Sequence, residues 1–457
     1  MTVNTFAKAC TDAPLLTQGL AEFVVSHPSQ GWDADVDHAA HRTFINWLGC
    51  AIGASGHPTL AAALAAVADL EPSSQASVLG RMERVDIASA AFLNGISSHT
   101  FDFDDTHLKT IIHPAGPVAS AILALAEKQR SSGRDLLDSL VLGVDVSCRI
   151  GNMIYPDHYD RGWHITGTTG MLGAAAGCAR LLNLDVAHTV MALGIAASQP
   201  VGLREQFGTM TKPMHPGAAA RAGLMSALLA AHGFTASPHA IEAPRGYAQT
   251  ISTKVDWNEA TDELGKRFEI SFNTFKPFAC GIVIHPSIDG CVRLRNAHGL
   301  QPDQIAKVDL KVHGLVLELT GKKTPRTGLE GKFSVYHSCA VGLMFGAAGE
   351  SEYSDAMVKR PDVMALRDRI HAVVDNSIAE SAADVLITCT DGRKLHVLVE
   401  HAIGSTENPM TDAQLDAKFN GLVEPVLGST KAASLRDVCW NLSEQPNLVA
   451  LFRAGCP

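Results

Sequence analysis

The stretch Thr168-Thr-Gly-Met-Leu-Gly-Ala-Ala-Ala-Gly-Cys-Ala-Arg-Leu-Leu182 decides the fold class that we predict for this chain. Gly170, Gly173, Ala174 and Gly177 fall at i, i+3, i+4 and i+7, so they share one face of a helix. Glycine costs about 1 kcal/mol against alanine inside a helix, so a nearly bare face needs a packing reason. We expect close contact with neighbouring helices, and a ligand contact is the alternative.

Helical spacing of apolar residues extends outward from this stretch, from the N-terminus to about Arg267, and it returns after Gly404. Short breaks of Gly, Pro or Asn separate the segments. The clearest predicted helices cover residues 44–54, 59–70, 118–128, 136–150, 168–182 and 218–233.

A different pattern occupies the region between these helical parts. Residues 305–312 and 384–400 alternate apolar and polar side chains, and Asp391-Gly392 is typical of a hairpin turn. We therefore predict a mostly α fold, in which residues 1–271 and 403–457 form a large all-helical domain. Residues 272–402 form an inserted, smaller α+β domain.

The composition excludes several classes of protein. Of the 457 residues, 37 are Lys or Arg and 47 are Asp or Glu, and the net charge of −10 argues against a nucleic-acid partner. The ten cysteines are scattered without a CxxC pair, which indicates reduced thiols and a cytoplasmic protein. The N-terminus lacks the apolar core of an export signal, and no stretch of 18 apolar residues predicts a membrane span.

Three predicted helices begin at basic side chains. His113 precedes one helix, His164 precedes the small-residue helix, and the run from Lys212 to His215 leads into a third. A helix N-terminus carries partial positive charge, so cations there predict an anion nearby. For any one of these residues taken alone, a surface or core role is the alternative.

Other candidates lie at Phe101-Asp-Phe-Asp-Asp-Thr-His107 and in the predicted small domain. Three carboxylates within four residues need cations or a proton to offset them, and a helix cap or a metal site is the alternative. Lys276 follows a polar-aromatic segment, and His285 either shares its site or caps the next helix. Tyr336 lies in an apolar helical run, where a structural hydrogen bond is the alternative.

The chain has no phosphate loop, GxGxxG, GxSxG or zinc spacing, so we expect neither a cofactor nor a metal. Lysines and histidines can bind carboxylates and move a proton at carbon. That chemistry fits elimination, decarboxylation or epimerisation of a small polycarboxylate.

At these motifs the sequence resembles the MmgE/PrpD family of cofactor-free enzymes. The similar segments are Arg42–Gly53, Ala91–His113, GWHITGTTG, GTMTKPMHPGAAARAG, FKPFACGIVIHPSIDG, KFSVYHS and NPMTDAQLDAKF. The resemblance implies a helical domain with an inserted smaller domain, an active site between them and a homodimer. The activities that it implies include those of 2-methylcitrate dehydratase, cis-aconitate decarboxylase and iminodisuccinate epimerase.

The resemblance also implies roles for single residues. His113 and His164 would transfer protons, Lys212 and Lys276 would bind substrate carboxylates, and Asp102 would orient a histidine or a lysine. Thr106 and Tyr336 would hydrogen-bond the substrate, and we add His215 and His285 as substrate-binding candidates.

The function that we expect is a cofactor-independent lyase acting on a small di- or tricarboxylate such as 2-methylcitrate or cis-aconitate. The first alternative is an epimerase of a dicarboxylate such as iminodisuccinate. The others are a metal-dependent hydratase and a non-catalytic helical protein that binds carboxylates.

Overall fold

The computed structural model describes residues 15–28 and 31–457. The N-terminal segment interpreted above as lacking an export signal, with Cys10, lies outside the described residues. The chain divides into two compact units. The larger unit takes in the described residues up to Thr100, then Asp104–Asn273 and Asp412–Pro457, and the smaller unit consists of Phe101–Phe103 and Thr274–Thr411.

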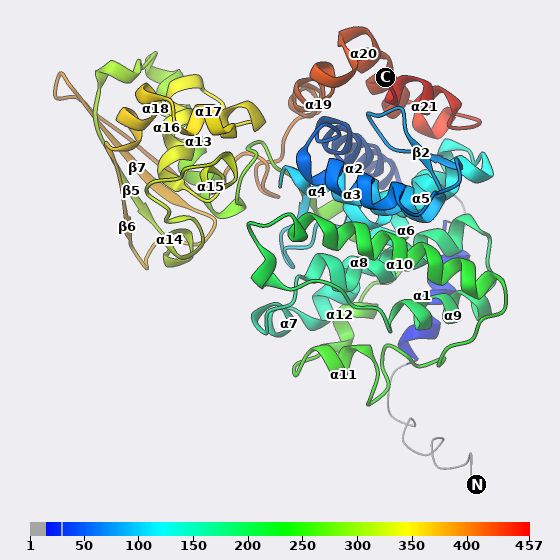
Figure 1. The fold of residues 1–457 in the computed structure, drawn as a ribbon. Coiled ribbons are helices and arrows are strands. Elements are labelled where there is room, and N and C mark those ends of the chain that lie inside the picture. The colour runs from blue at the N-terminus through cyan, green and yellow to red at the C-terminus, as the bar shows by residue number, and fades with distance from the viewer. Residues whose placement is uncertain (1–14, 29–30) are drawn as a thin grey trace. The chain divides into compact units, whose positions relative to one another are not determined.

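The larger unit is built mainly from helices (Figure 1). All six helices named from the sequence are confirmed, and each begins earlier than its predicted start. The helices are α1 (Leu16–Ser26), α2 (Ala34–Gly53), α3 (Pro58–Ala68), α4 (Ile87–Thr100), α5 (Ala115–Gln129), α6 (Gly133–Ile154), α7 (Asp157–Asp160), α8 (Ile165–Leu181), α9 (Val186–Ala196), α10 (Thr211–Ala231), α11 (Tyr247–Ile251), α12 (Trp257–Thr261), α19 (Asp412–Leu427), α20 (Ser429–Trp440) and α21 (Val449–Gly455).

The bare face of α8 packs against α5 and α6, as the glycine pattern predicts. A Cβ on Gly173 would lie 2.5 Å from the Gly143 carbonyl oxygen of α6, and one on Gly170 would lie 2.4 Å from Cγ of Pro117 in α5. These separations are below van der Waals contact, so only glycine allows the helices to approach this closely. The close-packing interpretation is confirmed.

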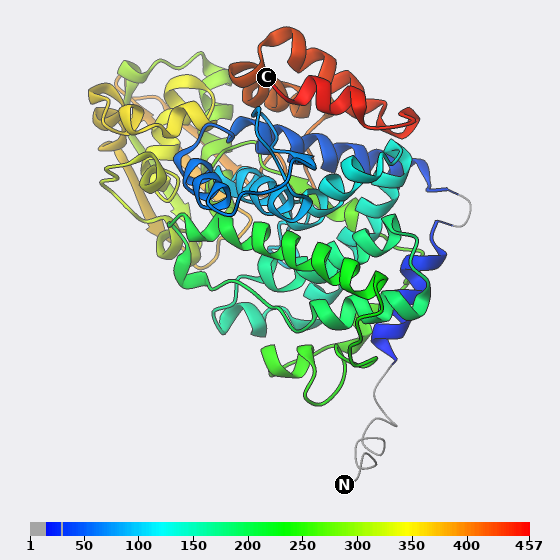
Figure 2. The same ribbon diagram turned by 45° about the vertical axis from the view of Figure 1, so that its right-hand side comes forward.

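Helix α19 packs against α2, although the two are far apart in the sequence (Figures 1 and 2). A Cβ on Gly49 of α2 would meet Phe419 of α19 at 3.0 Å, and Lys418 donates a 2.7 Å hydrogen bond to Asn46. Helices that are far apart in the sequence thus pack directly against each other.

The larger unit also contains strands, which the sequence analysis did not predict. Strands β1 (Ala76–Ser77) and β2 (Arg84–Val85) pair in antiparallel fashion, and β3 (Asp105–His107) precedes α5. "All-helical" is therefore wrong in detail for this part of the chain. The strands are too short for their two-residue periodicity to stand out in the sequence.

The smaller unit contains a four-stranded sheet in the order β6-β5-β7-β8. β5 pairs with β6 in parallel and with β7 in antiparallel fashion, and the predicted hairpin around Gly392 joins β7 to β8. Helices α13 and α16 pack on the sheet (Figure 1). The elements are β5 (Ile305–Val312), β6 (Ile370–Val374), β7 (Ala383–Cys389), β8 (Lys394–Val399), α13 (His285–His298), α14 (Gly314–Thr320), α15 (Gly328–Gly331), α16 (Val335–Phe345), α17 (Asp355–Val358) and α18 (Pro361–Arg367), with β4 (Asn273–Phe275) where the two units join.

Two segments join the smaller unit beyond the range 272–402. The first is Phe101–Phe103, and the second is 403–411, which the sequence analysis grouped with the helical part. Ile403 donates its amide hydrogen to Asp289, and Gly404 lies so close to Phe275 that an added Cβ would be 2.5 Å from its carbonyl oxygen. The mostly α fold class is confirmed, and the view of the smaller unit as an inserted domain stays a proposal.

Within residues 15–28 and 31–457, no single helix is both long and apolar enough to cross a membrane. Only α2 and α3 taken together reach that length and composition, and they are bent by 81° at the break between them. No disulfide joins the cysteines of the described part of the chain.

Candidate active site

Four of the predicted site residues lie at the starts of helices in the larger unit. His113 precedes α5, His164 is the N-cap of α8, and Lys212 and His215 lie in the first turns of α10. The run from Lys212 was predicted to lead into its helix, but α10 already begins at Thr211, so the run lies inside the helix.

The neighbours of His113 fix its ring in one tautomer. Its Nδ1 lies 2.6 Å from the carbonyl oxygen of Asp105, and its backbone N–H donates to the hydroxyl of Thr166 at 3.0 Å. A carbonyl oxygen only accepts hydrogen bonds, so Nδ1 of His113 must carry a hydrogen. Nε2 is therefore the nitrogen of this buried ring that can take up a proton. The Thr106 hydroxyl lies 3.4 Å from the same Nδ1.

A buried network fixes the loop that presents His113. His107 bonds through Nε2 to Glu269 at 3.0 Å and through Nδ1 to Thr110 at 2.7 Å, while its backbone N–H donates to Ile112. Burial opposes ionisation of Glu269, but the hydrogen bond from His107 and nearby arginine charges lower its pKa to about 2. An ionised Glu269 thus anchors His107, at one end of the loop that leads to His113.

His164 and His215 form a directly bonded pair. Their Nδ1 atoms lie 2.9 Å apart, and both side chains are buried. Burial, together with the nearby His99 and Lys212, lowers the pKa of His215 to about 4 and that of His164 well below its usual value. Both rings are therefore neutral near pH 7, and a single hydrogen lies between the two Nδ1 atoms. One ring then presents Nε2–H as a donor, and the other presents an unprotonated Nε2 as an acceptor.

Gly202 allows these two rings to meet. It has a φ of +112°, a conformation that favours glycine, and its carbonyl accepts the backbone N–H of His164. A Cβ at this position would lie 2.9 Å from the ring of His215 and 3.2 Å from Cβ of His164. A side chain at position 202 would push the pair apart.

Lys212 supplies positive charge beside the histidine pair. Its Nζ lies 5.1 Å from the ring centroid of Phe207, and the Phe207 ring packs edge-on against His164 with centroids 5.0 Å apart. A lysine over an aromatic face is partly desolvated, which strengthens its attraction for an anion.

Two residues beside His113 and His164 were not selected from the sequence: His99, at the end of α4, and Asp104. We refer to His99, His113, His164 and His215 together as the histidine cluster. Nδ1 of His99 lies 2.7 Å from Oδ2 of Asp104, and both side chains are fully buried. The His99 ring centroid is 4.7 Å from that of His113 and 5.7 Å from that of His164. His99 precedes the three-carboxylate motif by only three residues, and a histidine so close to those acids was the available signal.

Asp105, next to Asp104 in the sequence, is a second buried carboxylate. Its Oδ2 accepts hydrogen bonds from the backbone of Ala115, in the first turn of α5, and from Asn273. Burial and the adjacent Asp104 raise the pKa of Asp105 to about 7. The start of α5 therefore already holds an acidic group of the protein.

His99, Asp104 and His113 could also be considered as a metal site, because one atom from each lies within 4.8 Å of the others. In both rings Nδ1 is already engaged in a hydrogen bond. Nδ1 of His113 bears the hydrogen that bonds the Asp105 carbonyl, and Nδ1 of His99 faces an oxygen of Asp104. A metal ligand needs an unprotonated nitrogen, so a metal at this point would have to bind through the Nε2 atoms, while the Nδ1 hydrogen bonds orient the rings.

The smaller unit holds the remaining predicted residues, with Lys276 and Asp102 as a buried ion pair. Nζ of Lys276 lies 2.9 Å from both Oδ1 and the carbonyl oxygen of Asp102. Lys332 bonds the carbonyl oxygen of Phe101 and the carboxylate of Glu350. Two buried lysines therefore hold the segment Phe101–Phe103 in this unit. Asp102 has a φ of +53°, in the left-handed region that aspartate tolerates better than most residues.

Tyr336 and His285 lie near the starts of α16 and α13, two helices that pack against each other. Burial raises the pKa of Tyr336, and Nζ of Lys323 lies 5.8 Å from its ring centroid. His285 packs edge-on against Phe278 with ring centroids 5.4 Å apart. Their predicted substrate-binding roles stay predictions.

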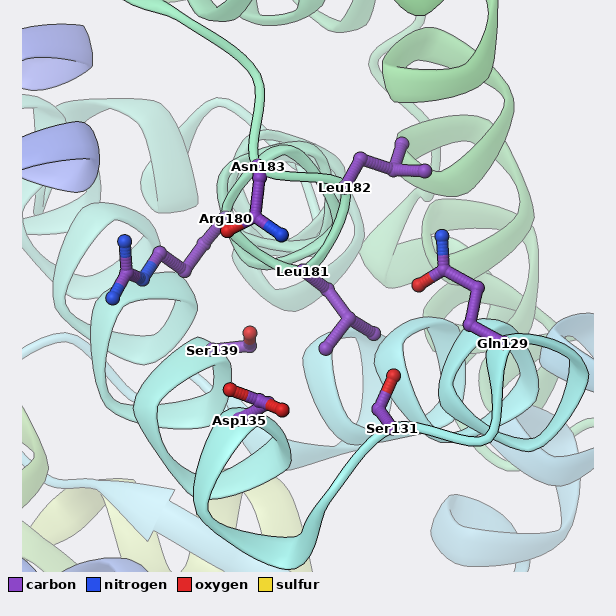
Figure 3. A pocket seen from close by; sticks show the side chains of 8 residues that line it. All are labelled: Gln129, Ser131, Asp135, Ser139, Arg180, Leu181, Leu182 and Asn183. Atoms are coloured by element: carbon purple, nitrogen blue, oxygen red, sulfur yellow. The ribbon is translucent and has the colours of Figure 1, made fainter. Parts of the chain in front are cut away.

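A separate cavity of about 400 Å³ lies in the larger unit at the ends of α5 and α8 and the start of α6 (Figure 3). Figure 3 shows Ser139 and Asp135 on α6 near Arg180 of α8. None of the predicted site residues lines this cavity, which is therefore distinct from the histidine cluster.

Comparison with known proteins matches most of the chain to one family. Residues 18–260 match the MmgE/PrpD N-terminal domain, and residues 278–444 match the MmgE/PrpD C-terminal domain. The chain therefore belongs to the MmgE/PrpD family.

Individual relatives are similar over three quarters or more of their length. The chain is 26% identical to a cis-aconitate decarboxylase-like protein oryM of Aspergillus oryzae, over 96% of each chain. It is 26% identical to a cis-aconitate decarboxylase of Aspergillus terreus over 93% of this chain and 92% of the relative. For the human cis-aconitate decarboxylase the identity is 26%, over 78% and 76% respectively. Family and relatives together indicate an enzyme of the lyase type.

Proposed function

We propose that this protein is a cofactor-independent lyase that removes water or carbon dioxide from a small di- or tricarboxylate. The observation that carries the proposal is the hydrogen bond from Nδ1 of His113 to the Asp105 carbonyl, which leaves Nε2 as a proton-transfer atom. The relatives named cis-aconitate decarboxylase support the same class of substrate.

Each part of the cluster has a place in such a reaction. Lys212 binds a carboxylate of the substrate through charge. His113 and the His164–His215 pair supply a base and an acid, which is the requirement for proton transfer next to a carboxylate. In a dehydration, the base removes a proton from carbon and the acid protonates the departing hydroxyl. In a decarboxylation, the C–C bond to carbon dioxide breaks, and the acid protonates the carbon that keeps the electron pair.

Lys276, Asp102, Thr106 and Tyr336 keep the roles that the family resemblance implies, as predictions. A homodimer and a cytoplasmic location are part of the same proposal. Light scattering on the purified protein would check the first, and fractionation of cells that express it would check the second.

Proton NMR in heavy water tests the reaction directly. The purified protein is incubated separately with cis-aconitate, 2-methylcitrate, citrate and iminodisuccinate. Loss of carbon dioxide or water from one of them supports the lyase, whereas exchange at the α-carbon without net loss assigns the chain to the epimerase class instead. If none of the four changes, the proposal is wrong for this substrate class.

A chelation control tests independence from a metal. After dialysis against EDTA and removal of the chelator, turnover should be unchanged. A loss that added Mg²⁺, Mn²⁺ or Zn²⁺ restores would favour the metal-dependent hydratase.

A further inference from the structure

No role has been assigned to His99 so far, although it lies at the centre of the histidine cluster. Its side chain is fully buried, and its ring lies next to both His113 and His164. A buried imidazole needs hydrogen-bond partners, because a polar ring without them destabilises the fold.

The partner of His99 is Asp104, whose carboxylate faces two histidines. Oδ2 lies 2.7 Å from Nδ1 of His99, and Oδ1 lies 3.5 Å from Nδ1 of His113. The hydrogen bond to His99 fixes the rotation of the carboxylate, so it also fixes where Oδ1 points. One carboxylate thus links an unassigned histidine to the one proposed to transfer a proton.

We propose that His99 is a positioning residue that acts through Asp104, holding this carboxylate where it supports His113 in its Nδ1–H form. The inference rests on the proposed function for its importance in turnover. It concerns a hydrogen-bonding state of the free protein, which can be measured without any substrate.

The charged and titratable groups that face His113 are Asp104, Asp105, His99 and His164. Of these, only Asp104 is positioned by His99 through a hydrogen bond. Loss of that bond should therefore act on His113 by way of Asp104. A carboxylate near Nδ1 also stabilises the imidazolium that forms when Nε2 takes up a proton.

The first measurement uses the unmodified chain with ¹⁵N-labelled histidine rings. Two-bond ¹H–¹⁵N spectra distinguish the two neutral ring forms, and the spectra of the variants below assign the signals. We expect both His99 and His113 as Nδ1–H, Nε2-unprotonated rings. An Nε2–H form of His99 would overturn the proposal, because that ring could not donate to Asp104.

Two variants of His99 then test the role of its Nδ1–H donor separately from that of its Nε2. His99→Asn keeps an N–H donor near the position of Nδ1 and removes Nε2, whereas His99→Leu removes both. We expect His99→Leu to lower the titration midpoint of His113 and to reduce kcat by about 10- to 100-fold with little change in KM. His99→Asn should stay within about threefold of the unmodified chain in kcat.

His158 offers a matched control. It is another buried histidine of the larger unit, bonded to the carbonyl of Ile251 and the hydroxyl of Thr168. His158→Asn should leave the titration of His113 unchanged, and circular dichroism melting should show that all variants are folded.

Besides an Nε2–H form of the His99 ring, one titration result and one kinetic result would overturn the role assigned to His99. One is a His113 titration that is the same in His99→Leu as in the unmodified chain. The other is a kcat in His99→Asn as low as in His99→Leu, which would mean that Nε2 of His99 itself is needed. Stoichiometric metal in the purified protein that is lost in His99→Asn would also overturn it, in favour of a metal centre. If all four candidate substrates stay unchanged while the ring forms are as expected, the proposed function fails and the positioning role stands.

Discussion

Nδ1 of His164 bonds directly to Nδ1 of His215 across 2.9 Å, which joins the start of α8 to the first turns of α10. Two neutral rings in this arrangement share one hydrogen, so the pair contains both a donor and an acceptor nitrogen. The pair therefore differs from His113, whose ring form is fixed by a backbone carbonyl.

Acid should destabilise the fold through this pair. In the unfolded chain a histidine titrates near 6.5, whereas in the folded chain the pKa of His215 is about 4. Below pH 6.5 the unfolded state therefore takes up protons first, and the stability that His215 contributes is lost as the pH falls towards 4. His215→Gln should reduce the dependence of the melting temperature on pH between 6.5 and 4. An equal slope in the variant would contradict the neutral pair.

Asp105 should have the opposite effect on stability. Its pKa is about 7 in the fold against a usual value near 3.9, so the folded state holds its proton more tightly. The protein then loses stability from this group as the pH rises from about 4 to 7, by at most about 1.4 kcal/mol per pH unit. Asp105→Asn should gain stability relative to the unmodified chain between pH 5 and pH 8, measured by urea unfolding. A difference that does not vary with pH would show that Asp105 ionises normally.

Replacing His113 by Asn should stop turnover without unfolding the protein. The amide of Asn can replace the Nδ1–H donor towards the Asp105 carbonyl, but it has no Nε2. We expect kcat to fall by about 10²- to 10⁴-fold and the melting temperature to change by only a few degrees. His188→Asn, at a half-exposed histidine of α9 that pairs with Asp185, is the control and should keep full activity. Near-normal turnover in purified His113→Asn would remove His113 from the reaction.

The Lys276–Asp102 pair predicts a rescue of stability without a rescue of activity. Lys276→Met leaves a largely buried carboxylate without its cation, which should cost about 3 kcal/mol in the free energy of unfolding. Adding Asp102→Asn removes the unpaired charge, so the double variant should recover a large part of that loss. If Lys276 binds a substrate carboxylate, both variants should stay inactive. A double variant as unstable as the single one would mean that Lys276 is held mainly by packing.

Much of the fold could be predicted because the sequence patterns that indicate it involve residues only a few positions apart. The glycine spacing in α8, the alternation in β5 and the Asp391-Gly392 turn all act within a few residues, and each element formed where predicted. β6 has no such signal, since its five residues become a strand only by pairing with β5. Local patterns also place residues 403–411 wrongly, because contacts to Asp289 and Phe275 decide to which unit they belong.

In the site, too, features set by neighbouring residues could be predicted, whereas contacts between residues far apart in the sequence could not. The positions of His113 and His164 at helix starts follow from nearby prolines and glycines, which the sequence displays. The bond between His164 and His215 joins residues 51 apart, and no pattern in the sequence fixes its length or geometry. His99 was missed for a related reason, since its partner and its neighbouring rings are apparent only after α4, α5 and α8 have packed.

The place of Phe101–Phe103 in the smaller unit limits how the chain can be divided for expression. A fragment spanning 274–411 would contain Lys276 and Lys332 but not the oxygens of Phe101 and Asp102 that accept their hydrogen bonds. Both ammonium groups would then be buried with part of their hydrogen-bonding capacity unmet, which destabilises a fold. A truncation that follows the longest continuous segment would therefore give an unstable product. A soluble version would need the three residues supplied as a linked peptide, or polar surface groups in place of both lysines.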